Sequence, residues 1–193
     1  MHITGLKKTL ALWISPETDL KAFECDEVYW FLGSRKGYEN GINTYLMTMI
    51  SRKPRQIVGY AVGKSVNKKA LQGIADSAPA AENYYTDGCL VYCDVMFQGI
   101  HRRNAFDKSD THNIESTNAD LRHYIAGLAR RSRTFYRTQE TLLAVVGVFV
   151  NAYNRYGEYK AKNRIPVKHR SPNPSKHLHK YRELPKSMID FVV

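Results

Sequence analysis

The sequence predicts an α/β domain with a five-stranded mixed sheet and flanking helices. Three runs rich in β-branched and aromatic residues, 26–33, 42–50 and 56–62, are separated by short turns, which is typical of an antiparallel meander. Helical and strand-like patterns then alternate, so the predicted order is β-β-β-α-β-α-β-α-α. At 193 residues, 43% of them hydrophobic, the chain is long enough for one domain with a substantial core.

The elements after the meander are predicted from capping residues, turn residues and apolar spacing. Asn67 is the expected cap of the first helix, Pro79 is expected to end it, and the Asp87-Gly88 pair is typical of a tight turn. The predicted elements are a helix over 67–77, a strand over 83–86, a helix over 90–97, a strand over 99–102 and a polar loop over 103–110.

Two longer helices are predicted next. Over 111–134 the apolar residues Ile114, Leu121, Ile125 and Leu128 recur at helical spacing, with Thr111 or Asn113 as the expected cap. A last helix over about 138–156 contains the run LLAVVGVFV, which is apolar on nearly every face and therefore predicts burial.

The charge of the chain favours an anionic partner. Its formal net charge is +11 and its pI is about 9.6, which indicates DNA or RNA. A membrane is disfavoured, because no stretch approaches the roughly 18 apolar residues that a spanning helix needs. We expect a cytoplasmic protein of a prokaryotic-type cell.

Composition divides the chain into a leader over 1–23, a domain over 24–157 and a basic arm over 158–193. The window 155–186 holds ten Lys/Arg, two Glu and four Pro. It is too polar to bury a core of its own, so we expect it to become ordered on a polyanion.

The cysteines do not suggest a disulfide framework, because their number is three. Cys89 and Cys93 are four residues apart and His101 follows, but a zinc site lacks an evident fourth ligand. Buried, apolar cysteine is the favoured interpretation.

Three acidic residues at the predicted strand and helix ends are candidates for a metal site. Asp26 opens the first strand, Asp87 follows the fourth, and Glu115 begins the helix over 111–134. If the first and fourth strands are neighbours, these carboxylates can converge, and Mg²⁺ would offset their repulsion. Two ions about 3.5–4 Å apart activate an attacking water or 3′ hydroxyl and stabilise the leaving oxygen. Alternatively, the three acids act as a strand-start residue, a turn former and a helix-dipole partner.

Three motifs resemble the catalytic core of the insertion sequence 1 transposases. They are DEVYWFLG at 26–33, YTDG at 85–88 and THNIESTNADLR at 111–122, the last matching the form T-x-x-I-E-x-x-N-x-x-L-R. The basic continuation LARRSRTF at 128–135 is also similar. The resemblance covers about residues 25–154.

The resemblance implies a ribonuclease-H-like fold and a DDE transposase that cuts and joins DNA ends with Mg²⁺, for which Mn²⁺ can substitute. Residue by residue, Asp26, Asp87 and Glu115 match the triad, and Asn118 and Arg122 match the polar positions after the glutamate. Glu27 points away from Asp26 on a strand, so only one of the two faces the site, and the match selects Asp26.

The resemblance also implies partners: the terminal inverted repeats of the element, target DNA, a second protomer and an upstream DNA-recognition segment. Arginine grips phosphates and aromatic rings stack on unpaired bases. The residues predicted to contact DNA are Lys108, Asn118, Arg122, Arg130, Arg131, Arg133 and Arg137. Two other functions stay open: a related hydrolase that cuts without joining, and a non-enzymatic nucleic-acid binder.

Overall fold

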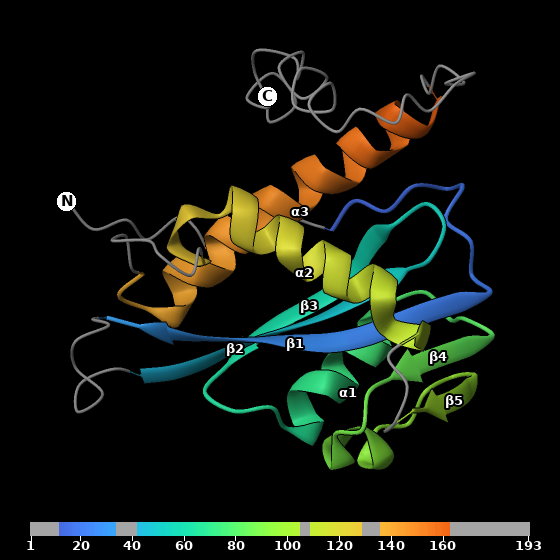
Figure 1. Cartoon of the computed structure of the whole chain (residues 1–193), viewed down its shortest axis with the longest axis horizontal. Coiled ribbons are helices and arrows are strands. Elements are labelled where there is room, and N and C mark those ends of the chain that lie inside the picture. Colours follow the sequence, from blue (N-terminus) through green and yellow to red (C-terminus); the bar gives the residue numbers. More distant parts are fainter. Residues whose placement is uncertain (1–11, 34–41, 105–108, 129–135, 163–193) are drawn as a thin grey trace, which may run out of the picture.

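A mixed sheet with helices on both faces forms the framework of the molecule. The computed structural model describes residues 12–33, 42–104, 109–128 and 136–162, with side chains for those up to residue 156 other than residue 109 (Figure 1). The fold class is α/β, with five strands in the order β3-β2-β1-β4-β5. Helices α2 and α3 cover one face of the sheet and α1 covers the other.

The strands combine an antiparallel and a parallel half. The first half comprises β1 (Ala22–Leu32), β2 (Ile42–Ser51) and β3 (Gln56–Gly63), which form the predicted antiparallel meander. The second half comprises β4 (Asn83–Thr86) and β5 (Ile100–Arg103), which continue the sheet in parallel from β1. The central strand β1 therefore lies between an antiparallel neighbour, β2, and a parallel neighbour, β4. The first and fourth strands are adjacent, which is the condition stated above for Asp26 and Asp87 to converge.

The three α-helices are α1 (Lys68–Ser77), α2 (His112–Tyr124) and α3 (Gln139–Lys162). Single 3₁₀ turns, η1 (Leu90–Asp94), η2 (Ser109–Thr111) and η3 (Ala126–Leu128), complete the described elements. The predicted cap of the first helix is confirmed, because the Asn67 side chain accepts the backbone N–H of Ala70 at 2.9 Å.

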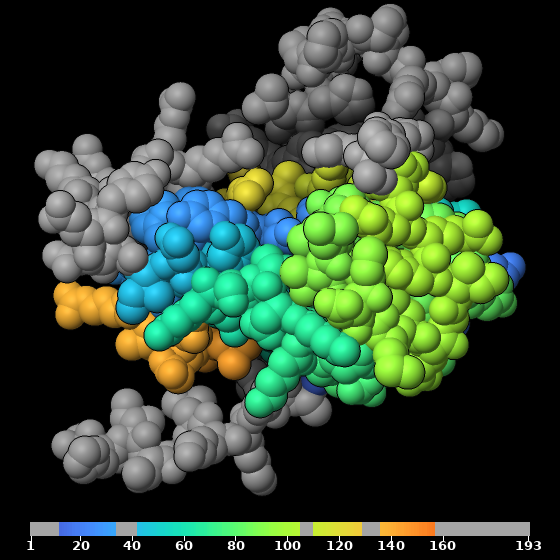
Figure 2. Space-filling model, turned by 90° about the horizontal axis from the view of Figure 1, so that it is seen from below, coloured from blue at the N-terminus to red at the C-terminus, as the bar shows by residue number. Residues whose placement is uncertain are grey.

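Alternating side chains of β1 supply two separate cores. Val28, Trp30 and Leu32 pack in the core beneath α2 and α3, whereas Phe23 and Cys25 pack in the core beneath α1. The two cores follow from the period-two alternation of a strand that is covered on both faces. Seen from below, α1 and the segment 83–104 lie side by side and close the second core (Figure 2).

The start of the first strand was predicted wrongly. β1 begins at Ala22, not at Asp26, so Asp26 lies inside the strand. The apolar pattern of the sequence does not reveal the first residues of the strand, because the charged Glu24 interrupts it. Glu24 is nevertheless fully buried, and it pairs with Arg52 at 2.7 Å. Residues 12–21, the described part of the predicted leader, contain no helix.

The helix predicted over 90–97 is a single 3₁₀ turn. Tyr92 and Val95 still face the core. The chain leaves the helical path because Gln72 of α1 binds both backbone groups of Met96, accepting its N–H at 2.8 Å and donating to its carbonyl at 3.0 Å. These bonds replace the ones that a longer helix would make.

The helix predicted over 111–134 ends at Tyr124. Ile125 is extended, and η3 follows. A Cβ at Gly127 would overlap the ring of Tyr136, so the chain turns here at a close approach that glycine permits. Ile125 and Leu128 nevertheless remain in the core, which is why the apolar spacing continued past the end of the helix.

The last helix ends later than predicted, and some predicted segments lie outside the described residues. The last helix starts near the predicted position but continues to Lys162, past the predicted domain boundary at 157. The turn over 35–40, most of the leader and the arm beyond 162 lie outside the described residues. Within the described ranges no helix combines the length and the apolar character needed to cross a membrane.

Candidate active site

Asp26 lies on the face of β1 that α2 covers. Its Oδ2 accepts the side-chain amide of Asn118 of α2 at 2.8 Å. The Thr48 hydroxyl of β2, which lies opposite Asp26 in register, donates to the Asn118 Oδ1 at 3.2 Å. Thr48 thereby fixes which end of the Asn118 amide faces the carboxylate. Asn118 is 4% exposed, and its amide bonds within the protein favour a positioning role over direct contact with DNA.

The pKa of Asp26 is raised from 3.8 to about 6. Burial is the largest cause, and the negative charges of Asp87 and Glu115 raise it further. Hydrogen bonds from the Glu27 backbone and the Asn118 side chain oppose the increase without cancelling it. Asp87 and Glu115 therefore each lie within electrostatic range of Asp26.

Asp87 owes its place to the parallel pairing of β1 with β4. The last registered pair is Cys25 with Thr86, so the next position along both strands is Asp26 beside Asp87. Asp87 is half-buried, and its Oδ1 accepts the backbone N–H of Cys89 at 2.9 Å, which closes the predicted tight turn. The turn-forming role and a place beside Asp26 are thus combined in one residue.

Glu115 projects from the first turn of α2 and is exposed. Asn118 follows three residues later, so the two side chains lie on neighbouring positions of one helix face. The helix therefore presents a carboxylate and an amide toward β1, and the amide reaches Asp26.

Glu27 lies on the opposite face of β1, as predicted. Its Oε2 accepts the buried Tyr92 hydroxyl at 2.9 Å. Burial raises the pKa of Glu27, the Tyr92 hydrogen bond lowers it, and the charges of Asp26 and Asp87 raise it again. Glu27 is therefore electrostatically coupled to the acidic residues although it belongs to the other core.

The donor chemistry of this region suits a hard cation, since Mg²⁺ prefers carboxylate oxygens and like charges need neutralisation. The spacing is more open than a finished metal centre. Among the described residues, no three His, Cys, Asp or Glu side chains come close enough together to hold one ion. Ion binding would therefore require the Asp26, Asp87 and Glu115 side chains to draw together.

The cysteines form no metal site with the histidine that follows them. Cys25 is buried, Cys89 half-buried and Cys93 exposed, so the expectation of buried cysteine is confirmed for Cys25 and is wrong for Cys93. The Nε2 of His101 lies 2.9 Å from the Thr86 hydroxyl. Burial, and then Arg103, lower the pKa of His101, which favours the neutral form of the imidazole.

The predicted DNA-binding residues are only partly described. Arg122 is half-buried on α2 and Arg137 is exposed. The predicted contacts that lie outside the described residues are Lys108, Arg130, Arg131 and Arg133.

Sequence reasoning missed two arginines beside the acidic residues. The Arg103 Nε donates to the Gly88 carbonyl at 3.1 Å, beside Asp87, and Arg55 donates to the Ser116 hydroxyl of α2 at 2.7 Å. Neither has a sequence signal, because both depend on contacts distant along the chain.

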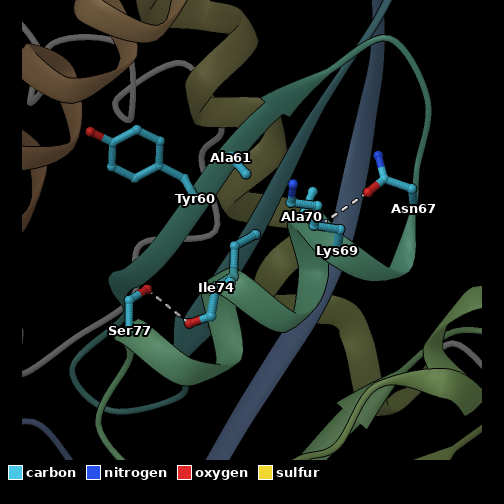
Figure 3. Close-up of a pocket in the computed structure, with 8 residues that line it drawn as sticks. Tyr60, Ala61, Asn67, Lys69, Ala70, Ile74 and Ser77 are labelled. Carbon is cyan, nitrogen blue, oxygen red and sulfur yellow. Dashed lines mark hydrogen bonds between the residues drawn. The ribbon is translucent and has the colours of Figure 1, made fainter.

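A pocket of about 360 Å³ between α1 and β3 is a separate feature (Figure 3). Its lining holds one charged side chain, Lys69, and no carboxylate. The Tyr60 ring points away from the α1 residues in this view. It lies on the α1 side of the sheet, across from the face that carries Asp26.

The chain matches no model of a known protein family and no curated protein.

Proposed function

We propose that the chain is the catalytic domain of a DDE transposase with a ribonuclease-H-like fold, which cleaves DNA at insertion-element ends and joins them to a target. The observation that carries the proposal is the electrostatic coupling of Asp26 to Asp87 and Glu115. Sequence motifs select these three acids from among the 18 in the chain, and they come from β1, the end of β4 and α2.

The topology supports the same proposal. A mixed sheet of order β3-β2-β1-β4-β5, with β1 antiparallel to β2 and parallel to β4, is compatible with a ribonuclease-H-like fold. Since one fold hosts many functions, the site rather than the sheet must carry the functional argument.

In this proposal Asp26, Asp87 and Glu115 hold divalent metal, which supplies charge neutralisation and a more acidic attacking oxygen. Asn118 keeps the Asp26 carboxylate oriented, and Thr48 keeps the Asn118 amide oriented. No side chain need form a covalent intermediate, because the attacking group is a water or the 3′ hydroxyl of DNA.

The partners proposed are the terminal inverted repeats, target DNA, a second protomer and an upstream recognition segment. The net charge of +11 supports a polyanionic partner. The exposed Arg137 and the basic residues at 108 and 130–133 are proposed to contact phosphates, which positions DNA without reading its sequence.

The proposal is tested on a plasmid that carries the coding sequence with the DNA flanking it on both sides, together with a second plasmid as target. We expect Mg²⁺-dependent cleavage near the element ends and covalent joining of the 3′ ends to the target. Asp87→Asn and Glu115→Gln should abolish both reactions by at least about 10³-fold while the gel shift of the flanking DNA is retained.

Asp76→Asn is the matched control, because Asp76 is an exposed acid of α1 on the other side of the sheet. It should cleave and join like the wild type. Retained cleavage by Asp87→Asn in Mg²⁺ would refute the proposal. Cleavage without joining, even of pre-cut ends, would identify a hydrolase, and metal-independent binding without cleavage would identify a binder.

A further inference from the structure

Glu24 is a fully buried carboxylate with a complete set of partners. It is 0% exposed, and its Oε1 accepts Arg52 Nε at 2.7 Å and Asn113 Nδ2 at 2.8 Å. Its Oε2 accepts the backbone N–H of Ile114 at 2.8 Å. Burying a carboxylate is costly unless donors satisfy its oxygens, and here three donors do so, one of them cationic.

Glu24 takes the place of the cap of α2. Thr111 occupies the N-cap position but makes no side-chain capping hydrogen bond. The N–H of Ile114, the third helical residue, is one that a capping side chain ordinarily satisfies, and Glu24 satisfies it from β1. Its negative charge is also favourable beside a helix N-terminus.

Arg52, the partner of Glu24, also contacts strand β4 and the segment before α2. Its Nη2 donates to the Asp110 carbonyl at 2.6 Å, and its guanidinium lies 3.8 Å from the centre of the Tyr85 ring of β4. Glu24 and Arg52 together therefore tie β1 and β4 to the segment that enters α2.

The two contacts between β1 and α2 match in spacing. Glu24 and Asp26 are two residues apart on one face of β1, which is about 6.6 Å. Their partners Ile114 and Asn118 are four residues apart on α2, which is about 6 Å. The helix therefore runs along the strand with both contacts formed at once, and Glu115 lies between them.

From this match we infer that Glu24 is a positioning residue that fixes the start of α2 and thereby sets the positions of Glu115 and Asn118 relative to Asp26. The inference rests on the proposed function for its consequence at the metal site. The local contact that it invokes is read separately, by amide exchange.

Glu24→Gln is the sharpest test, because it keeps the side-chain shape but leaves one acceptor oxygen for donors on both sides. Whichever way the amide turns, its NH₂ group faces either Ile114 N–H or the Arg52 and Asn113 donors. The full chain is compared with wild type by hydrogen exchange of backbone amides 113–118, by the Asn118 side-chain NH₂ resonances and by Mn²⁺ titration.

Asn154→Leu is the matched control for lost stability. Asn154 is also fully buried, but it bonds Ile57 of β3 and Trp13, not α2. We expect Glu24→Gln to speed exchange at 113–118, shift the Asn118 resonances and weaken Mn²⁺ binding by about 10–100-fold, as loss of an outer contact commonly does. Asn154→Leu, still folded, should leave the Asn118 resonances and the Mn²⁺ affinity unchanged, and should speed exchange only at amides that exchange through global unfolding.

Unchanged exchange, Asn118 resonances and Mn²⁺ affinity in folded Glu24→Gln would overturn the inference. Shifted Asn118 resonances and weakened Mn²⁺ binding in Asn154→Leu would also overturn it, since they would then report general loosening. Wild-type protein that binds no Mn²⁺ would instead refute the proposed function, so the two failures are distinguishable.

Discussion

Replacing Asp26 by Asn should stabilise the metal-free protein while destroying its proposed activity. The carboxylate is held at a pKa of about 6 in the folded chain, against 3.8 ordinarily. The folded state therefore binds more protons than the unfolded state between these pH values, and the free energy of unfolding falls as pH rises through this window. Above about pH 6 the full cost is present.

The size of that cost follows from the two pKa values. A difference of this size corresponds to about 3 kcal/mol, since each pKa unit is worth about 1.4 kcal/mol. Asn has nearly the same shape and keeps an oxygen to accept the Asn118 amide, so it removes the charge without removing the hydrogen bond. At pH 7 we expect Asp26→Asn to be more stable than wild type by up to about 3 kcal/mol.

The assay is urea unfolding of both proteins from pH 3.5 to pH 7.5 in EDTA. The difference between them should be small near pH 3.5, grow through pH 4–6 and then level off. Mg²⁺ should then stabilise the wild type by about 2.7 kcal/mol at 100 times its dissociation constant and leave Asp26→Asn unchanged. A variant less stable than wild type at pH 7, or a difference independent of pH, would refute the electrostatic reasoning.

Three further perturbations test the surrounding structure. Tyr92→Phe removes the hydroxyl that lowers the pKa of Glu27, so an NMR titration should show that pKa raised further; a lowered one would contradict the assignment. Asn154→Leu should destabilise by about 2–4 kcal/mol in urea, because it leaves buried backbone groups unpaired. Gly59→Ala should cost about 1–3 kcal/mol, because its Cβ would lie 2.6 Å from the Ile74 Cγ2, and Ile74→Leu should recover part of that cost; purely additive effects would contradict the contact.

The sheet could be predicted because its strands obey simple local rules. The turns of the meander are short, which leads to antiparallel pairing, whereas longer connections, one through α1 and one through the turn η1, precede the parallel strands β4 and β5. The ends of elements were less predictable, because tertiary contacts decide them. The Gln72 side chain bonds both backbone groups of Met96 just after the turn at 90–94, and the Tyr136 ring packs so closely on Gly127, shortly after the end of α2, that a Cβ there would overlap it.

The candidate site was predictable to the extent that motifs mark it. Asp26, Asp87 and Glu115 are named by sequence, and the structure couples their charges. Thr48 and Arg103 could not be foreseen, because they act through contacts with residues remote along the chain. Their roles require the pairing of β1 with β2 and of β4 with β5.

The two carboxylates on one face of β1, Glu24 and Asp26, differ in how well their surroundings stabilise the negative charge. This contrast is the strongest reason to propose a functional role for Asp26. Glu24 has three hydrogen-bond donors, including the Arg52 guanidinium. Asp26, two residues on, has the Asn118 amide and a backbone N–H against burial and two negative charges. The surroundings of Glu24 show that this fold can satisfy a buried carboxylate on β1 with donors. The unfavourable electrostatic energy left at Asp26 is therefore not required by the fold, and such an energy is typical of functional sites, here one that binds a cation.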